Sequence, residues 1–160
     1  MVNSALRIIT LVNIFCLSYI ITACAASKFL RYEVIDDELA PYYNNYIQLI
    51  KHNCKSNKYN DAPRKLIVFV DKLKESEKEK ELGVCTLGIF GNFKIEILKS
   101  WWDNADPIER QEMIYHEGAH CLLKKEHSPD KHNYLYAYFN TLPLDIATKQ
   151  AIDDIKSVCK

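Results

Sequence analysis

Hydrophobic and polar positions follow two different periods along the chain, which predicts both helices and strands. Apolar residues at helical spacing predict one helix over residues 41–53 and another over about 145–158. The β-branched and aromatic run Leu66–Val70 is typical of a short buried strand. Between that strand and residue 81 the chain is almost entirely charged, which indicates a solvated segment.

Alternation and glycine placement predict a hairpin after this charged segment. A strand over residues 84–89 is followed by a turn at Gly91-Asn92 and by a second strand, Phe93–Leu98. Lys94 and Glu96 alternate with apolar residues in the second strand. We therefore expect one face of this strand to be buried and the other to be solvated.

A third helix has a clear start signal. Asp106 can cap the backbone N–H groups, Pro107 suits the first turn, and Glu109 completes a capping box. The helix is expected to run to about Lys124, and the tryptophans at 101–102 to cap the core beside it. The order of elements is helix, three strands, helix, loop and helix, which predicts an α+β fold.

Composition narrows the possible functions. The 160 residues suit a single domain, and 48% hydrophobic residues are typical of a globular protein. Lys and Arg number 21, as do Asp and Glu. Nucleic-acid binding through a basic face is therefore not expected. We expect the chain to act as a monomer.

The N-terminal residues predict export. A short basic segment and an apolar run over residues 8–21 are typical of a signal peptide, which we assign to residues 1–23. Ile21–Cys24 resembles a bacterial lipobox and predicts lipidation of Cys24. Ala25 then favours an outer-membrane anchor facing the periplasm, and residues 24–40 form a tether before a domain over 41–160. Ordinary cleavage after Ala25, giving a secreted soluble protein, is the alternative.

Six cysteines agree with export. Cys16 leaves with the signal peptide and Cys24 carries the lipid, so four remain: Cys54, Cys85, Cys121 and Cys159. Without a CxxC pair, a zinc site made of four cysteines is disfavoured. Two disulfides in an oxidising compartment fit better, and the spacing leaves all three pairings open.

The sequence His116-Glu117-Gly118-Ala119-His120 lies on the third predicted helix. Residues four apart project from one helix face, so His116 and His120 can bind the same ion, and neutral imidazole is a good ligand for Zn²⁺. Glu117 can act as the general base toward a zinc-bound water. A catalytic zinc site needs a third protein ligand, for which we favour His127, with His132 and Glu126 as alternatives.

The layout resembles a zincin metallopeptidase, in particular the metzincins and a group of small bacterial and phage metallopeptidase lipoproteins with an HExxHC helix. The resemblance spans about residues 42–155. Its matching stretches are Gly83-Val84-Cys85, Trp101-Trp102, His116–Cys121, Lys125-Glu126-His127 and Asn133–Tyr136. It implies a small, mostly antiparallel sheet packed on the HExxH helix, with N- and C-terminal helices.

The resemblance also implies roles for single residues. His116, His120 and His127 are the expected zinc ligands, Glu117 is the general base, and the disulfides pair Cys85 with Cys121 and Cys54 with Cys159. Three features depart from the metzincin pattern. His127 is one residue further from His120, Leu123 or Lys124 replaces the turn glycine, and Leu135 replaces the turn methionine.

Tyrosines follow this turn, and any of them can be expected to stabilise an oxyanion or bind substrate. The alternative is that they pack in the core and at its rim. They are Tyr134, Tyr136 and Tyr138.

These expectations describe an exported, lipid-anchored zinc peptidase that acts on a peptide or protein substrate. The substrate is expected to lie extended along a strand edge of the hairpin that contains Phe93–Leu98. A catalytically silent zincin-fold binding lipoprotein is the main alternative, and a hydrolase of cell-wall peptides is a third.

Overall fold

The computed structural model describes residues 32–54, 64–73 and 81–159. The predicted signal peptide, the lipidation site Cys24 and most of the tether lie outside these residues. The tether boundary is nevertheless informative, because a strand occupies Tyr32–Ile35 and Leu39 is fully buried. The folded domain therefore begins before residue 41.

Four strands form one mixed sheet in the order β1-β2-β4-β3. Their bounds are β1 Tyr32–Ile35, β2 Arg64–Val70, β3 Gly83–Leu87 and β4 Phe93–Leu98. Strand β4 pairs antiparallel with β3 and parallel with β2. The prediction of a mostly antiparallel sheet is therefore wrong for the central pair of strands, β2 and β4, which run parallel. The reason is that β4 inserts between β2 and its own hairpin partner, which places β3 at the edge.

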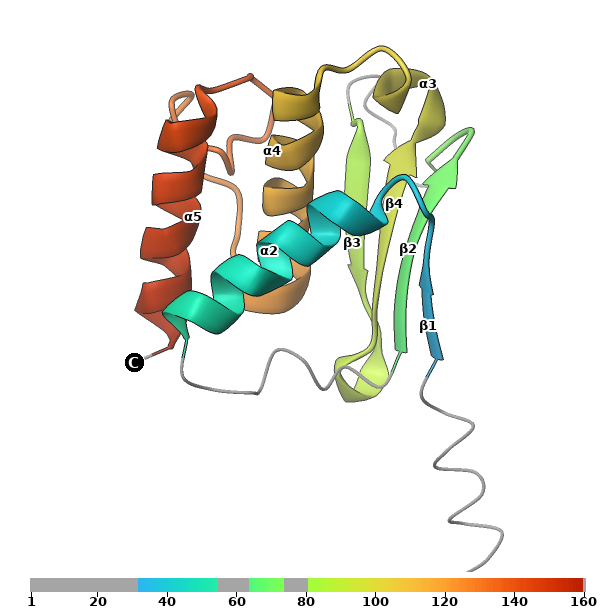
Figure 1. Ribbon diagram of the computed structural model, residues 1–160, viewed down its shortest axis with the longest axis horizontal. Coiled ribbons are helices and arrows are strands. Elements are labelled where there is room, and N and C mark those ends of the chain that lie inside the picture. Colours follow the sequence, from blue (N-terminus) through green and yellow to red (C-terminus); the bar gives the residue numbers. More distant parts are fainter. Residues whose placement is uncertain (1–31, 55–63, 74–80, 160) are drawn as a thin grey trace, which may run out of the picture. The chain divides into compact units, whose positions relative to one another are not determined.

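The longer helices lie on the same side of this sheet (Figure 1). They are α2 Ala40–Asn53, α4 Pro107–Gly118 and α5 Leu144–Val158, and a short helix α3, Lys99–Trp102, leads from β4 toward α4. Helix α4 contacts both α2 and α5 as well as β3. All three predicted long helices are therefore present, and α4 is the element shared between the helical layer and the sheet.

The hairpin differs from its prediction in two details. Strand β3 ends at Leu87, and a 3₁₀ turn, η2 Ile89–Gly91, replaces the end of the expected strand. In β4, Glu96 is only 8% exposed although its face was expected to be solvated. Because β4 has neighbouring strands on both sides, Glu96 is covered, and it pairs with Lys94 at 2.5 Å.

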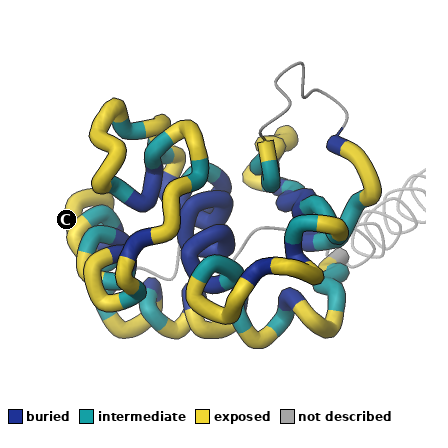
Figure 2. The backbone as a smooth tube through the Cα atoms, turned by 90° about the horizontal axis from the view of Figure 1, so that it is seen from above, coloured by how far each residue is buried: buried dark blue, intermediate teal, exposed yellow. Residues whose placement is uncertain are grey.

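Helix α4 begins with the capping box that the sequence predicts. The Asp106 carboxylate accepts the N–H groups of Ile108 and Glu109, and the Glu109 side chain accepts the N–H of Asp106. From residue 111 to 119 every position is buried, including polar ones (Figure 2). A helix buried on all sides can only be accommodated because α2, α5 and the sheet surround it.

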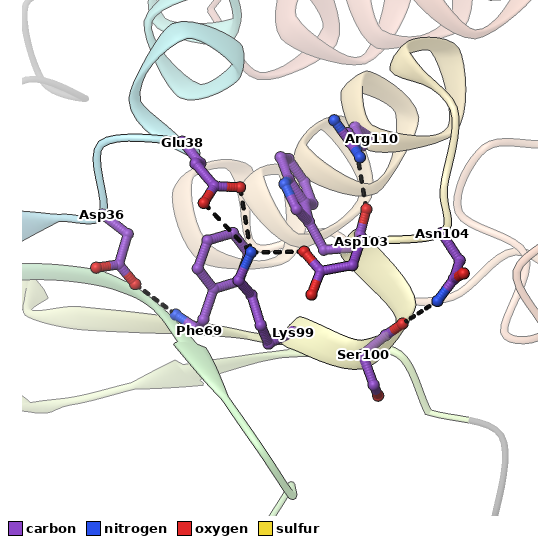
Figure 3. A network of polar contacts seen from close by, with 9 residues as sticks. Asp36, Glu38, Phe69, Lys99, Ser100, Asp103, Asn104 and Arg110 are labelled. Carbon is purple, nitrogen blue, oxygen red and sulfur yellow. Dashed lines mark hydrogen bonds and ion pairs between the residues drawn. The ribbon is translucent and has the colours of Figure 1, made fainter.

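A polar network at one end of the sheet secures α3 (Figure 3). Lys99 bridges Glu38 and Asp103, at 3.2 and 2.6 Å. Nearby, the Asp36 carboxylate accepts the backbone N–H of Phe69 at 2.7 Å. These contacts join the β1–α2 connection to β2 and α3.

Both disulfides implied by the resemblance are present. Cys54–Cys159 joins the end of α2 to the end of α5, and Cys85–Cys121 joins β3 to the turn that follows α4. The second bridge ties the edge strand to the residue directly after His120.

Candidate metal centre

Three histidines converge at the end of helix α4. The helix continues into a π-helical turn, η3 Ala119–Leu123, so that His116 and His120 lie one turn apart on the same face. Their Nε2 atoms are 3.1 Å apart. The ligand nitrogens of these two residues and of His127 all lie within 4.8 Å of one another, and together they can hold a metal ion.

A left-handed residue returns the chain to the site. Lys124 has φ 55° and ψ 38°, the only positive φ of a non-glycine residue in the described chain. This conformation ends the π-helical turn, and both Lys124 and Lys125 donate their N–H groups to the Ala119 carbonyl. His127 follows two residues later, with its ring centroid 4.6 Å from that of His120. Lys124 thus occupies the position where the resemblance expects glycine.

Backbone carbonyls fix the protonation of two of the imidazoles. His116 Nδ1 lies 2.7 Å from the Tyr134 carbonyl, and His120 Nδ1 lies 2.5 Å from the Lys125 carbonyl. A carbonyl oxygen can only accept, so each Nδ1 carries the hydrogen. In the neutral rings both Nε2 atoms are then bare acceptors that face each other.

This arrangement fits a cation. Two facing lone pairs repel each other unless a positive charge lies between them, and neutral imidazole nitrogens with their other N–H anchored are typical zinc ligands. Tetrahedral zinc with Zn–N bonds of about 2.0–2.1 Å sets neighbouring ligand nitrogens roughly 3.3 Å apart. The separation in the structure is close to that value. The donor set of three imidazoles is also one that zinc accepts.

Burial keeps His116 in the form that binds metal. Its side chain is buried, and loss of hydration lowers its pKa to about 4. The hydrogen bond to Tyr134 raises the pKa, and the charges of His120 and His127 lower it. His116 is therefore neutral near pH 7.

Glu117 lies beside the histidines and is almost fully buried, with 4% of its surface exposed. Burial raises its pKa to about 8; a hydrogen bond from the Cys85 backbone lowers the pKa, and the charge of Glu81 raises it. The close approach of β3 depends on Gly83, because a Cβ there would lie 3.0 Å from Glu117 Oε1. A bound dication would favour the charged carboxylate.

These groups face a cavity of about 380 Å³. The edge strand β3 and the chain that follows η3 both line it. Its lining residues include Val84, Leu87, Glu117, His127 and Tyr138. The cavity is thus bounded by a strand that has no partner on its outer side among the described residues.

The remaining residues that the sequence suggested are the alternative metal ligands and the tyrosines. Neither His132 nor Glu126 belongs to the metal-binding group, although Glu126 lines the cavity. Tyr138 is 52% exposed at the cavity. Tyr136 packs against Tyr138 with ring centroids 5.7 Å apart, and is not among the lining residues.

Tyr134 does not fit the expected substrate-binding role. Its ring is buried and its hydroxyl donates to Asp154 at 2.9 Å, so the packing alternative describes this residue. Leu135, which replaces the turn methionine, is also buried, and its carbonyl accepts the N–H of Ser128.

Sequence reasoning missed the two carbonyl groups that orient the histidines. They belong to Tyr134 and Lys125, and a backbone carbonyl leaves no signature in residue identity. Asp154 of α5 contacts the side chains of both of these residues, but nothing in the sequence distinguishes it from the other acidic residues of that helix.

Comparison with known proteins gives no family assignment: no family model, no curated protein and no solved structure matches the chain.

Proposed function

We propose that the chain is an exported, lipid-anchored, zinc-dependent peptidase. The observation that carries the proposal is the pair of bare Nε2 atoms on His116 and His120, 3.1 Å apart, with His127 and the buried Glu117 beside them. This combination can hold a cation and has a carboxylate next to it, which is the arrangement required for metal-assisted hydrolysis.

The residues have separate roles in the proposed reaction. Zinc, when bound, supplies a Lewis acid that polarises the scissile carbonyl and lowers the pKa of a water molecule. Glu117 takes the proton of the attacking water and passes it to the leaving amine. The N–H of Cys85 holds the carboxylate of Glu117 in place. The buried walls around His116 limit access of bulk water.

The free edge of β3 is the proposed substrate platform. Strand β3 pairs only with β4 among the described strands, and its residues line the cavity. An extended peptide can add to such an edge through main-chain hydrogen bonds, with alternate side chains in pockets. From the sequence we expect the substrate to lie along a strand edge of the hairpin that contains Phe93–Leu98. Since β4 is an inner strand, the other half of that hairpin is the available edge.

The proposed location rests mainly on the sequence. Two disulfides are typical of proteins from an oxidising compartment. Among the described residues no helix is both long and apolar enough to cross a bilayer. Anchoring through Cys24 is tested by Cys24→Ser, which should abolish incorporation of labelled fatty acid. Unchanged labelling would contradict the lipid anchor.

The decisive experiment separates metal binding from hydrolysis. Purified protein should bind about one zinc ion, measured by elemental analysis, and should cleave members of a peptide library. Glu117→Gln should keep the metal and lose cleavage, because only the base is removed. Glu38→Gln, an exposed residue that pairs with Lys99, is the matched control and should retain both.

Two results would change the assignment. Absence of bound zinc would contradict the proposed metal centre and therefore also the proposed peptidase activity. Zinc binding without cleavage of any peptide would favour the silent binding lipoprotein, which the replacement of the turn glycine and methionine by Lys124 and Leu135 also favours.

A further inference from the structure

One carboxylate on α5 contacts both residues whose carbonyls orient the histidines. Asp154 Oδ2 accepts the hydroxyl of Tyr134 at 2.9 Å, and Asp154 Oδ1 pairs with Lys125 Nζ at 2.8 Å. The carboxylate is about three-quarters buried, with 25% of the side chain exposed. Both of its oxygens are therefore used, in a setting with limited solvent.

The two partners hold different ligands. The Tyr134 carbonyl accepts from His116, and the Lys125 carbonyl accepts from His120. Each partner thus binds Asp154 through its side chain and a histidine through its backbone. Asp154 is in this way connected to two of the three histidines without touching either.

The surrounding contacts support a positioning role. Gln150, one turn earlier on α5, accepts the N–H of Tyr134 at 3.0 Å and donates to the His132 carbonyl at 2.9 Å. Lys125 Nζ also donates to Ser157 at 3.0 Å. One face of α5 therefore holds the loop after η3, which contains no helix or strand of its own between residues 124 and 143. The carbonyls in this loop depend on such contacts for their position.

We propose that Asp154 is a positioning residue of the metal centre, acting on His116 through Tyr134 and on His120 through Lys125. The inference rests on the proposed zinc site and deepens it. Hydrogen-bond partners of metal ligands fix ring orientation, and their loss typically weakens metal binding about 10–100-fold. We expect an effect of that size here, because both rings lose support together.

The test compares neighbouring aspartates on the same helix. Asp154→Ala should weaken zinc binding about 10–100-fold in a competition titration with a chromogenic chelator. Asp153→Ala is the matched control, since Asp153 is 61% exposed and pairs with the exposed Lys149 on its own helix. It should bind zinc as the unchanged protein does. Asp154→Asn keeps one acceptor for Tyr134 and should lie between the two.

A second pair of variants tests the route. Tyr134→Phe and Lys125→Met remove the side-chain contacts but keep both carbonyls. Each should weaken zinc binding on its own and add little in combination with Asp154→Ala, because the same links are already broken. If Asp154→Ala does not fold, Lys125→Met, at a 26% exposed side chain, supplies the measurement.

The Co²⁺-substituted protein gives a spectroscopic signal that depends on the geometry of the metal ligands and does not change with stability alone. The visible ligand-field spectrum should change in Asp154→Ala and stay unchanged in Asp153→Ala. Equal zinc affinity and spectra in Asp154→Ala and the unchanged protein would overturn the proposal, even if the metal-free variant were less stable. Failure of the unchanged protein to bind zinc would instead overturn the metal centre itself.

Discussion

The backbone of Gly118 lies directly against the ring of Tyr46. A Cβ on Gly118 would come within 2.4 Å of Tyr46 Cε1, a distance at which one of the two must move. Tyr46 has no room to move, because it is fully buried and packs on Tyr115. The small residue inside the HExxH sequence is thus required by the packing of α2 on α4.

Gly118→Ala should therefore destabilise the fold by about 1–3 kcal/mol, the usual cost of overpacking a core. Chemical denaturation of the metal-free protein measures this. In the double variant with Tyr46→Leu, the two costs should be less than additive, because the clash is removed. Strict additivity would contradict the contact.

Lys124 should be replaceable by glycine with a gain in stability. A left-handed conformation costs a residue with a side chain about 1–2 kcal/mol, and glycine avoids this cost although it gains freedom in the unfolded chain. We expect Lys124→Gly to raise the free energy of unfolding by about 1 kcal/mol.

The control is Lys124→Ala, which removes the charge and keeps the strain. Its stability should match that of the unchanged protein in thermal and denaturant unfolding. A gain as large as that of Lys124→Gly would show that the charge of Lys124, and not its backbone conformation, is the cost.

Glu112 should make stability depend on pH. Its side chain is 1% exposed and accepts the N–H of Leu142, and burial raises its pKa to about 7, with a further contribution from Glu109. Because the pKa of Glu112 is higher in the folded state, its contribution to stability is fully present below the pKa of the unfolded chain. The contribution is lost as pH rises through the pKa of the folded state. The loss should occur between about pH 4.5 and 7 and reach at most about 3 kcal/mol.

Glu112→Gln removes this titration and keeps an acceptor for Leu142. The measurement is the difference in unfolding free energy between the two proteins at several pH values. The unfolding free energy of Glu112→Gln should increase relative to that of the unchanged protein as pH rises from 5 to 8. A constant difference would mean that Glu112 does not titrate in this range.

The two disulfides should differ in their contribution to stability. Cys54–Cys159 spans 105 residues and Cys85–Cys121 spans 36. In the chain-entropy model the longer loop stabilises by about 5 kcal/mol and the shorter by about 4. Replacing both cysteines of a pair by alanine, followed by denaturant unfolding, measures each value.

The pairs should also differ at the metal centre. Loss of Cys85–Cys121 should weaken zinc binding, because this bridge holds the residue after His120 and the strand that contacts Glu117. Loss of Cys54–Cys159 should leave zinc affinity nearly unchanged in the fraction that remains folded. Equal effects on zinc affinity would contradict the distinction.

The helices and the histidine cluster could be predicted from sequence because their signals are local. The capping box at Asp106 and the helical spacing after Pro41 are read within a few residues, and both helices form as expected. His116 and His120 share a face for the same reason. His127 could be predicted as the third ligand because a single turn of the chain after the helix is enough to bring it back to the other two histidines.

The rest depended on contacts between distant segments. Nothing near Glu96 indicates that β2 will cover its strand, so its burial was missed. The parallel pairing of β2 with β4 depends on how the chain crosses the sheet. Asp154 is one acid among many on a helix surface, and only the folded return loop gives it Tyr134 as a partner.

The three candidate ligands span 12 residues, from His116 to His127, although the carbonyl that orients His116, that of Tyr134, lies farther along the chain. A short peptide with this sequence therefore contains every donor nitrogen, and so does the denatured protein. Metal that associates with the denatured ensemble stabilises the fold by less than its native-state affinity suggests. Thermal shifts produced by added zinc should accordingly underestimate how tightly the native centre holds it.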